Sequence, residues 1–238
     1  MSNWLAETLQ QCHLTEEVEG YLLGRGAREE SYRSLGVVTW QIPYDKPPED
    51  AAFLKRYGPP RGLNLEGWLI CPILSPRGRV IGFEGRDTQK KSLTEFLLPE
   101  AQWNPVWLGL TPEVMEKLWC GGDLWVTEGL FDKFPLEWIV PKTDAVLATL
   151  RARMSDRLVE FIRRFCRGWV HMVYDLDDTG RKATHGWVDQ KGKRIWGALE
   201  KLNRAGVPCR DVSYSGGTDP GDVWDRGGLE ALRSAFSL

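Results

Sequence analysis

The sequence predicts an α/β protein, with a mostly parallel sheet in the second half of the chain and a smaller α+β region before it. In the second half, four short apolar runs alternate with helical stretches, and these runs cover residues 124–127, 145–149, 168–174 and 207–214. Alternating strands and helices are typical of a parallel sheet with right-handed crossovers. In the first half, residues 68–74 and 80–86 form two apolar runs joined by a Pro-Arg-Gly turn, which is typical of an antiparallel hairpin.

The segments around this hairpin predict a small helical region, a loop and a third strand. Residues 1–40 carry helical spacing, with a break at Arg25-Gly26 and a second short helix after it. Residues 41–67 are rich in Pro and Gly, which predicts a surface loop with one short amphipathic piece at 51–57. After the hairpin, a meander is expected to continue through residues 95–98.

The helix before the third predicted parallel strand has one apolar face. Its apolar side chains recur at three-and-four spacing, and they are Leu158, Val159, Phe161, Ile162, Phe165 and Cys166. Most arginines of this segment fall on the opposite face. The change from a hairpin to an alternating pattern divides the chain into an expected first region at 1–118 and a second at 119–238, which ends in a short helix.

The composition is that of an ordinary globular protein. Of the 238 residues, 42% are hydrophobic and 27% are charged, and the net charge is -2. The five cysteines form no Cys-x-x-Cys pair, so neither a disulfide framework nor a zinc site is expected. No apolar run approaches the ~20 residues of a membrane span, and the start of the chain has no basic signal region. We therefore expect a cytoplasmic protein without a membrane partner.

Acidic residues follow three of the predicted strands. Glu128 comes directly after the first parallel strand, Asp175 and Asp177 follow the third, and Asp219 and Asp222 lie beyond the fourth. Ligands of such sheets gather at the carboxyl ends of the strands, so these side chains are expected to meet at one edge. Asp175 and Asp177 are two residues apart on extended chain, which predicts that they face the same side. Because hard divalent cations prefer carboxylate oxygens, the pattern predicts metal-assisted phosphoryl transfer.

Each acidic motif also has a plainer explanation. The Val-Thr-Glu-Gly segment that ends at Gly129 is common where a strand runs into a turn. Residues 175–180 could cap the following helix or imitate a calcium loop, although the distal Glu of a full calcium-binding loop is absent. Residues 219–222 are typical of a turn. The joint order of the three motifs at strand ends favours the metal interpretation.

Basic residues flank this acidic series in the sequence. Residues 151–167 contain six arginines, and residues 181–204 contain seven Lys or Arg. Such segments suit a polyanion held over metal ions, whereas a solvated helix face explains any single arginine equally well. Within the second segment, residues 186–194 predict a basic hairpin that touches nucleic acid with Trp187 as a stacking ring, or an insertion whose tryptophan covers the core.

Together these motifs resemble a known family. The segments that resemble the TOPRIM domain of DnaG-type primases, topoisomerases and some nucleases are residues 124–129, 174–181 and 219–222. The segments that are similar to the RNA polymerase core of DnaG-type primases are residues 21–26, 53–58 and 72–86. The resemblance runs from Leu14 to Leu232 and implies a TOPRIM, Rossmann-like sheet preceded by a small primase-core region.

The resemblance implies a DNA primase, a template-directed enzyme that makes short RNA primers on single-stranded DNA from ribonucleoside triphosphates. It implies that the catalytic carboxylates, which also bind Mg²⁺ or Mn²⁺, are Glu128, Asp175 and Asp177. The same resemblance implies that three further carboxylates complete the metal site, namely Asp132, Asp219 and Asp222.

The resemblance also implies contacts to the nucleotide and template. Arg86 matches a family arginine beside their path, and Arg181 matches the arginine after the Asp-x-Asp loop. Weaker candidates for phosphate contact, for which a solvated surface position is an equal alternative, are Lys55, Arg56 and Lys182.

The sequence departs from the family pattern in three places. The family's Lys-Tyr-Leu-Asn segment corresponds to residues 95–98, which lack the lysine and the asparagine. The zinc-binding set of cysteines and histidines is not found, and the resemblance ends soon after the TOPRIM motifs. We therefore expect a minimal form without zinc-binding and helicase-binding domains, as suits a phage or another mobile element. Expected partners are a replicative helicase or a separate zinc-domain protein.

Two other functions would use the same residues. A TOPRIM nuclease would activate water with the acidic cluster, and the primase-like motifs at residues 72–86 argue against it. A non-catalytic nucleic-acid-binding relative would keep the fold without the chemistry. The intact set of Glu128, Asp175 and Asp177 argues against that second alternative.

Overall fold

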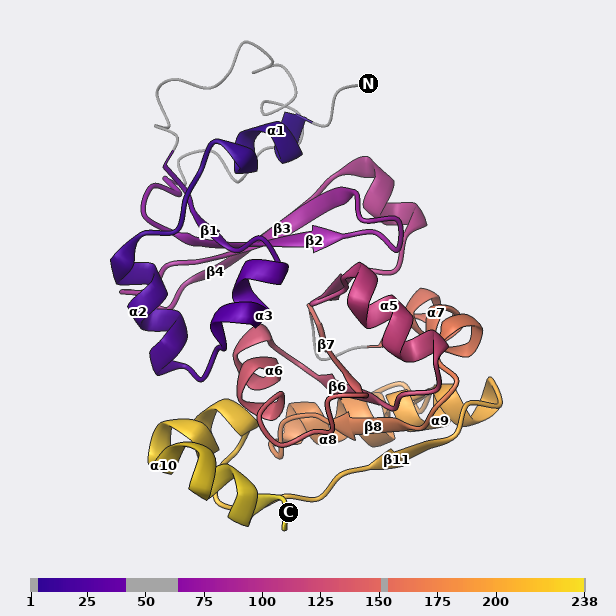
Figure 1. The fold of residues 1–238 in the computed structure, drawn as a ribbon. Helices are drawn as coiled ribbons and strands as arrows, with labels where there is room; N and C mark the ends of the chain where they lie inside the picture. The colour runs from indigo at the N-terminus through magenta and orange to yellow at the C-terminus, as the bar shows by residue number, and fades with distance from the viewer. Residues whose placement is uncertain (1–3, 42–63, 151–153, 238) are drawn as a thin grey trace.

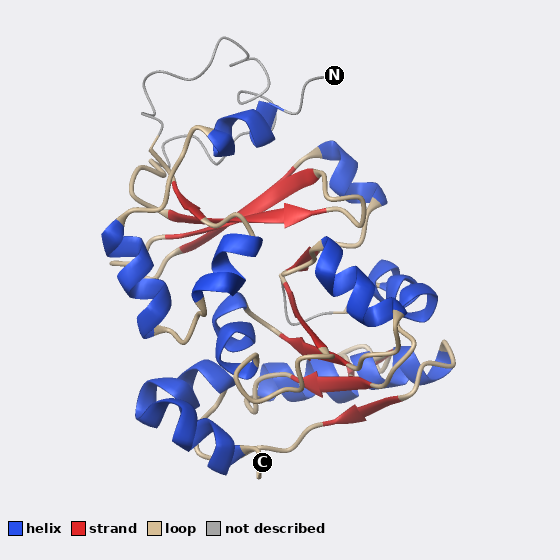
Figure 2. Ribbon diagram, viewed as in Figure 1, coloured by secondary structure: helices blue, strands red, loops and turns tan. Residues whose placement is uncertain are grey.

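The computed structural model describes residues 4–41, 64–150 and 154–237. Within these ranges the chain forms two large sheets with helices around each, one above the other in Figure 1, and a small two-stranded sheet. Strands are coloured red in Figure 2. The amphipathic piece expected at residues 51–57 lies outside the described residues.

The first sheet is antiparallel and has the strand order β1-β2-β3-β4. Its strands are β1 (Val38–Thr39), β2 (Leu69–Leu74), β3 (Val80–Arg86) and β4 (Leu93–Leu97). The predicted hairpin is confirmed by the pairing of β2 with β3, and the predicted meander by the pairing of β3 with β4. The helical elements of this half are α1 (Trp4–Gln10), α2 (Glu16–Gly24), α3 (Glu29–Ser34) and the 3₁₀ helix η1 (Pro99–Trp103).

The second sheet confirms the predicted mostly parallel arrangement, with the order β11-β8-β6-β7-β5. Its parallel strands are β6 (Leu124–Thr127), β7 (Ala145–Thr149), β8 (Val170–Val173) and β11 (Cys209–Asp211). The edge strand β5 (Trp107–Leu108) runs antiparallel to β7. Both β5 and the helix α5 (Pro112–Trp119) come before the boundary expected at residue 119, yet they pack on this second sheet.

Helices cover both faces of the second sheet because its strands are apolar on both sides. On β6, Val126 packs with α5, α7 (Asp156–Phe165), α8 (Asp178–His185) and α9 (Ala198–Arg204). The neighbouring Trp125 points to the other face, toward α6 (Leu130–Leu136) and α10 (Pro220–Ala235). This alternation follows from the two-residue repeat of a strand. Between α8 and α9 lies a small hairpin of β9 (Trp187–Val188) and β10 (Arg194–Ile195).

The predicted amphipathic helix is confirmed as α7. The Ser155 hydroxyl accepts a hydrogen bond from the Leu158 backbone N–H at 3.3 Å, which caps its first turn. The residues that it buries are Leu158, Val159, Phe161 and Ile162. Its apolar face therefore holds it on the sheet, since burying aliphatic and aromatic side chains is the main stabilising term in such packing.

Helix α6 joins the two halves of the molecule. Its Leu130, Phe131 and Phe134 pack in one cluster with residues of α2 and β2. Polar contacts reinforce this packing: the Ser31 hydroxyl lies 2.6 Å from Glu137 Oε2, and the Trp138 indole N–H donates to the Gly26 carbonyl at 2.8 Å. The first half of the chain is thereby held against the helix that follows Glu128.

Two expectations from composition concern covalent bonds and membranes. All five cysteines are free thiols. In the described part of the chain, no helix has both the length and the apolar character that crossing a membrane requires.

Candidate active site

Glu128 and Asp175 lie side by side because their strands are neighbours. β6 pairs with β8 in parallel, with Thr127 opposite Val173, so the residues that follow these two strands emerge at one edge. The backbone N–H of Asp175 donates to Glu128 Oε1 at 3.4 Å. The sequence predicted that acidic side chains come together at the carboxyl ends of the parallel strands, and Glu128 and Asp175 do so.

The environment of these two carboxylates opposes their ionisation. Burial, and then the charge of Asp175, raises the pKa of Glu128 to about 7. Burial, followed by the charges of Asp219 and Asp177, raises the pKa of Asp175 to about 7. Burial and like charges both favour the neutral form of a carboxyl group, and a bound cation would reverse that preference.

Asp177 has a different geometry from the one expected. β8 ends at Val173, so Asp175 and Asp177 lie in a turn and do not share a strand face. Asp177 caps α8, accepting a hydrogen bond from the Gly180 N–H at 2.7 Å. The turn is tight: a Cβ on Gly180 would lie 2.1 Å from the Asp175 carbonyl oxygen and 2.8 Å from Glu128 Oε1. Glycine at this position lets α8 begin directly beside the carboxylates.

Asp132 and Asp219 join the cluster from helices. Asp132, on the first turn of α6, accepts hydrogen bonds from the Gly129 N–H at 3.1 Å and the Gly221 N–H at 3.4 Å. Burial, then the charges of Asp219 and Asp175, raises the pKa of Asp132 well above its usual range. Asp219 caps α10 and accepts from the Asp222 N–H at 2.6 Å.

Asp222 is not brought into this cluster. Its Oδ2 accepts from the Thr218 N–H at 3.0 Å and pairs with Arg226 at 2.7 Å. The Thr218 N–H, together with Arg226, lowers the pKa of Asp222. This carboxylate therefore stabilises the turn before α10 and is already neutralised by its partners.

Two arginines from the first half of the molecule approach the cluster over one aromatic ring. The guanidinium carbon of Arg86, at the end of β3, lies 4.5 Å from the centre of the Phe131 ring, and that of Arg25 lies 5.6 Å from it. Phe131 immediately precedes Asp132 in α6, so both cations contact the helix that bears this carboxylate. Arg25 also pairs with Asp225 of α10, and its Nη2 lies 2.9 Å from where a Cβ on Gly221 would be.

Arg86 was expected at the site, whereas Arg25 was not. In the sequence, Arg25-Gly26 indicated only a helix end, although it lies in a segment that resembles the primase core. Its partners Phe131 and Asp225 are far away in the chain, so no local pattern pointed to them.

The remaining basic residues predicted to contact nucleic acid are not seen to approach the carboxylate cluster in the described part of the chain. Arg181 folds back on its own turn, where its Nε donates to the Leu176 carbonyl at 2.8 Å. Lys182 is exposed on α8. Lys55 and Arg56 lie outside the described residues.

The donor set fits a hard divalent cation, because it consists of carboxylate oxygens alone. Asp175 Oδ1 is buried and has no hydrogen-bond partner in the described part of the chain, which leaves an oxygen free for a cation. As they stand, no three Asp, Glu, His or Cys side chains within residues 4–41, 64–150 and 154–237 are arranged to hold an ion. A cation would therefore have to draw the side chains of this cluster inward.

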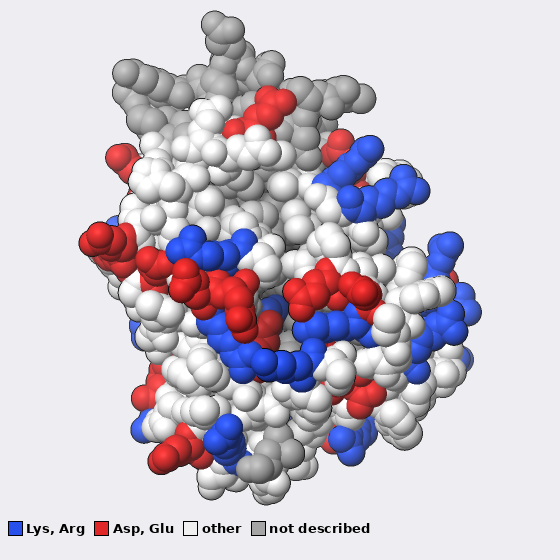
Figure 3. All heavy atoms as spheres, in the orientation of Figure 1, with Lys and Arg blue, Asp and Glu red and all other residues white. Residues whose placement is uncertain are grey.

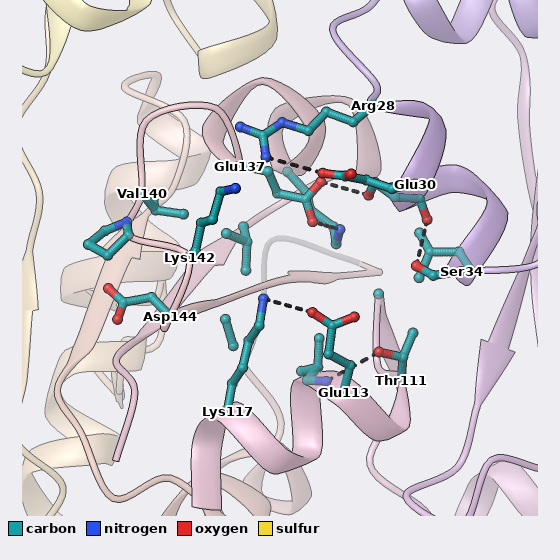
Figure 4. A pocket seen from close by; sticks show the side chains of 18 residues that line it. Arg28, Glu30, Ser34, Thr111, Glu113, Lys117, Glu137, Val140, Lys142 and Asp144 are labelled. Carbon is teal, nitrogen blue, oxygen red and sulfur yellow. Dashed lines mark hydrogen bonds and ion pairs between the residues drawn. The ribbon is translucent and has the colours of Figure 1, made fainter. Parts of the chain in front are cut away.

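A separate cavity of about 350 Å³ lies between α3, α5 and α6. Charged side chains of both signs crowd this region in Figure 3, and Figure 4 shows Lys117 reaching toward Glu113 and Arg28 toward Glu30. The cavity includes Asp144 at the start of β7, so it lies at the amino-terminal edge of that strand. It contains none of the cluster's carboxylates, and its acids and bases largely neutralise one another.

Comparisons with known proteins agree on one family. No family model matches the chain. A DNA primase of Aquifex aeolicus (strain VF5) is 30% identical over 169 residues, which make up 69% of this chain and 31% of that protein. The chain thus spans 31% of the length of this curated relative.

Solved structures show the same fold. The zinc-binding and RNA polymerase domains of the Aquifex aeolicus primase match with a TM-score of 0.66 and 24% identity, over 98% of this chain and 59% of that one. A DnaG primase catalytic domain bound to single-stranded DNA matches with a TM-score of 0.66 and 22% identity, over 97% of this chain and 76% of that one. At these identities the matches establish the architecture.

Proposed function

Because the chain is a relative of the DnaG-type primases and has the fold of their catalytic core, we propose that it synthesises short RNA primers on single-stranded DNA. The observation that carries the proposal is the carboxylate cluster at the carboxyl ends of β6 and β8, with Arg86 and Arg25 over the Phe131 ring of the helix that bears Asp132. An acidic centre with cations beside it suits a triphosphate held over metal ions.

In this proposal the cluster holds Mg²⁺ or Mn²⁺. The first group of ligands is Glu128, Asp175 and Asp177, with Asp132 and Asp219 beside them. The cations supply charge that neutralises the triphosphate and makes the primer 3′-hydroxyl a better nucleophile. Asp222 acts indirectly, by holding the turn that carries Asp219.

The basic residues have separate roles. Arg86 and Arg25 bind the phosphates of the incoming ribonucleotide, since both guanidinium groups lie over Phe131 of the helix that bears Asp132. Arg181, Lys182, Lys55 and Arg56 are candidates for contacts with the template backbone. In this proposal the protein acts in the cytoplasm. A replicative helicase or a separate zinc-domain protein would be a further partner.

The test uses purified protein, single-stranded DNA, labelled ribonucleotides and Mg²⁺ or Mn²⁺. We expect primer-length products from the wild type and none from Asp175→Asn, because that change removes a charged ligand and keeps the shape of the side chain. Asp178→Asn is the matched control: Asp178 is exposed at the start of α8, and its change should leave synthesis intact.

Other outcomes would replace the proposal. Degradation of the DNA without synthesis, lost in Asp175→Asn, would indicate a nuclease. Binding of DNA with neither reaction would indicate a non-catalytic relative. Equal synthesis by Asp175→Asn and the wild type would show that the cluster is not the site.

A further inference from the structure

The hairpin of β9 and β10 projects from the helical layer on a rigid base. Gly186 and Gly197 lie so close at this base that a Cβ on Gly197 would be 2.3 Å from the Gly186 nitrogen. Arg194 donates to Glu200 Oε1 at 2.7 Å and to the His185 carbonyl at 2.9 Å. These contacts join β10 to both flanking helices and so position the base of the hairpin relative to α8.

The tip of the hairpin, residues 189–193, carries a net positive charge of one, because Lys191 and Lys193 stand against the single carboxylate of Asp189. The carboxylate of Asp189 is used within the turn, where its Oδ1 accepts from the backbone N–H groups of Lys191 and Lys193 at 2.9 Å each. The Lys191 and Lys193 side chains are exposed, and neither has a carboxylate partner among the described residues. Exposed, unpaired ammonium groups on a fixed turn are suited to phosphate groups.

An exposed aromatic ring lies at the base of the same hairpin. Trp196, the residue after β10, is 43% exposed, and the guanidinium carbon of Arg204 lies 3.8 Å from the centre of its ring. Trp187, the ring expected from the sequence to stack on bases, is half-buried and engaged with other residues. Indole and guanidinium planes are the groups on which unpaired bases stack. The structure therefore favours Trp196 in that role.

We propose that this hairpin is a second contact for the single-stranded template, with Lys191 and Lys193 on its phosphates and Trp196 on a base. The inference rests on the proposed function for the identity of the strand. α8 begins next to Asp177 and ends at His185 beside the hairpin, and its eight residues span about 12 Å. A strand that leaves the carboxylate cluster reaches the hairpin within a few nucleotides.

Single-stranded DNA fits this surface better than a protein does. The exposed side chains of the hairpin include the Lys191 and Lys193 ammonium groups beside Val188 and Trp196, whereas the centre of a stable protein interface is depleted in charged residues. Because the base is rigid, binding orders little of the protein and loses little conformational entropy.

The test measures the affinity for a labelled oligodeoxythymidylate by fluorescence anisotropy, as a function of salt. We expect Lys191→Ala with Lys193→Ala to weaken binding about tenfold and to reduce the slope of log K against log salt by about 1.4, since each single-strand phosphate contact contributes about 0.7. Trp196→Ala should weaken binding by about tenfold with an unchanged slope, and Trp196→Phe should recover most of it. Photocrosslinking to an oligonucleotide with 5-iodouracil should label Trp196.

The matched control is Lys90→Ala with Lys91→Ala, which removes the same charge from the exposed turn between β3 and β4. This control should keep the wild-type salt slope, and thermal unfolding should show that every variant is folded. An unchanged affinity and slope in the lysine double variant, or no binding of DNA by the wild type, would overturn the inference.

The primer assay separates this inference from the proposed function. Primer synthesis by the wild type, together with hairpin variants that bind DNA normally, would overturn the hairpin contact alone. Loss of DNA binding in the hairpin variants without any primer synthesis by the wild type would support the contact and remove the proposed function.

Discussion

At the scale of single residues, the site is defined by carboxylates that the fold forces together. Glu128 and Asp175 carry raised pKa values because burial and their neighbours' charges oppose ionisation. Asp222, only three residues after Asp219, has a lowered pKa because the Thr218 N–H and Arg226 surround it. Of these two acids, Asp219 is the one whose charge raises the pKa values of Asp175 and Asp132.

Glu128→Gln should stabilise the metal-free protein at alkaline pH. The fold raises the pKa of Glu128 from 4.5 to about 7. Between these two pH values the folded chain keeps a proton that the unfolded chain has released. The wild type therefore loses stability as the pH rises from 4.5 to about 7. Glutamine cannot ionise. Near pH 8 we expect the variant to be more stable than the wild type by about 1–2 kcal/mol, which is less than the full pKa shift would give because the Glu128 side chain is partly exposed to solvent. Near pH 4 we expect the two proteins to be equally stable.

Urea unfolding in EDTA at both pH values measures this difference. Adding Mg²⁺ should then stabilise the wild type more than Glu128→Gln, since the variant lacks one ligand charge. A variant that is less stable than the wild type near pH 8 in EDTA would contradict the electrostatic account of the cluster. Retained primer synthesis by the variant would contradict its catalytic role.

At the scale of elements, the beginnings of helices position the acidic groups. α6 begins after Glu128, α8 begins at the cap Asp177, and α10 begins at the cap Asp219. A side chain that caps a helix has a restricted direction, because it must accept hydrogen bonds from the first turn. The elements thus orient the carboxylates before any cation binds.

Gly180→Ala should disturb this arrangement. The added methyl group would lie 2.1 Å from the Asp175 carbonyl oxygen and 2.8 Å from Glu128 Oε1. The carbonyl oxygen belongs to the backbone, so it cannot move away as easily as the end of a side chain can. We expect a loss of about 2–3 kcal/mol in the free energy of unfolding and a loss of primer synthesis. Urea unfolding and the primer assay measure the two effects.

The control for this change is Gly20→Ala, in the middle of α2, where no atom lies within 4 Å of the new Cβ. Alanine is the better helix former by up to about 1 kcal/mol, so this variant should gain stability. A Gly180→Ala protein as stable and active as the wild type would show that the turn has more room than the geometry indicates.

At the scale of the whole molecule, α6 carries the contact between the two halves. Lys133 of this helix is 2% exposed and pairs with Glu137, which also accepts from the Ser31 hydroxyl of α3. Gly109 makes room for the lysine, since a Cβ there would lie 2.3 Å from Lys133 Cε. A buried ion pair thus lies where the first half of the chain meets the helix that bears Asp132.

Glu137→Ala should destabilise the protein strongly, because it leaves the Lys133 ammonium buried without a partner. We expect a loss of about 3 kcal/mol in urea unfolding, with most of it recovered when Lys133→Met is added. Glu113→Ala removes an exposed partner of Lys117 in the same cavity and should cost less than about 1 kcal/mol. Equal stability of Glu137→Ala and the wild type would show that the pair does not hold the interface.

Local patterns in the sequence determined the strands and turns of the second sheet. The apolar runs that became β6 and β8, and the acidic turns after them, are recognisable because strand burial and turn chemistry depend on neighbouring residues. The mutual approach of Glu128 and Asp175 followed from parallel pairing alone. The resemblance to the TOPRIM domain depended on the same short motifs, and the resemblance to DnaG-type primases depended also on residues 21–26, 53–58 and 72–86.

Only the tertiary structure decided which distant groups meet. It brought Arg25 to Asp225, which are 200 residues apart, and exposed Trp196 while half-burying Trp187. These outcomes depend on how helices pack on the sheet and between the two halves of the molecule. Contacts of this kind leave no periodic pattern or short motif in the sequence from which they could be predicted. The sequence by itself therefore determined the acidic site and the chemistry it suits, and three-dimensional packing decided which cations and rings surround it.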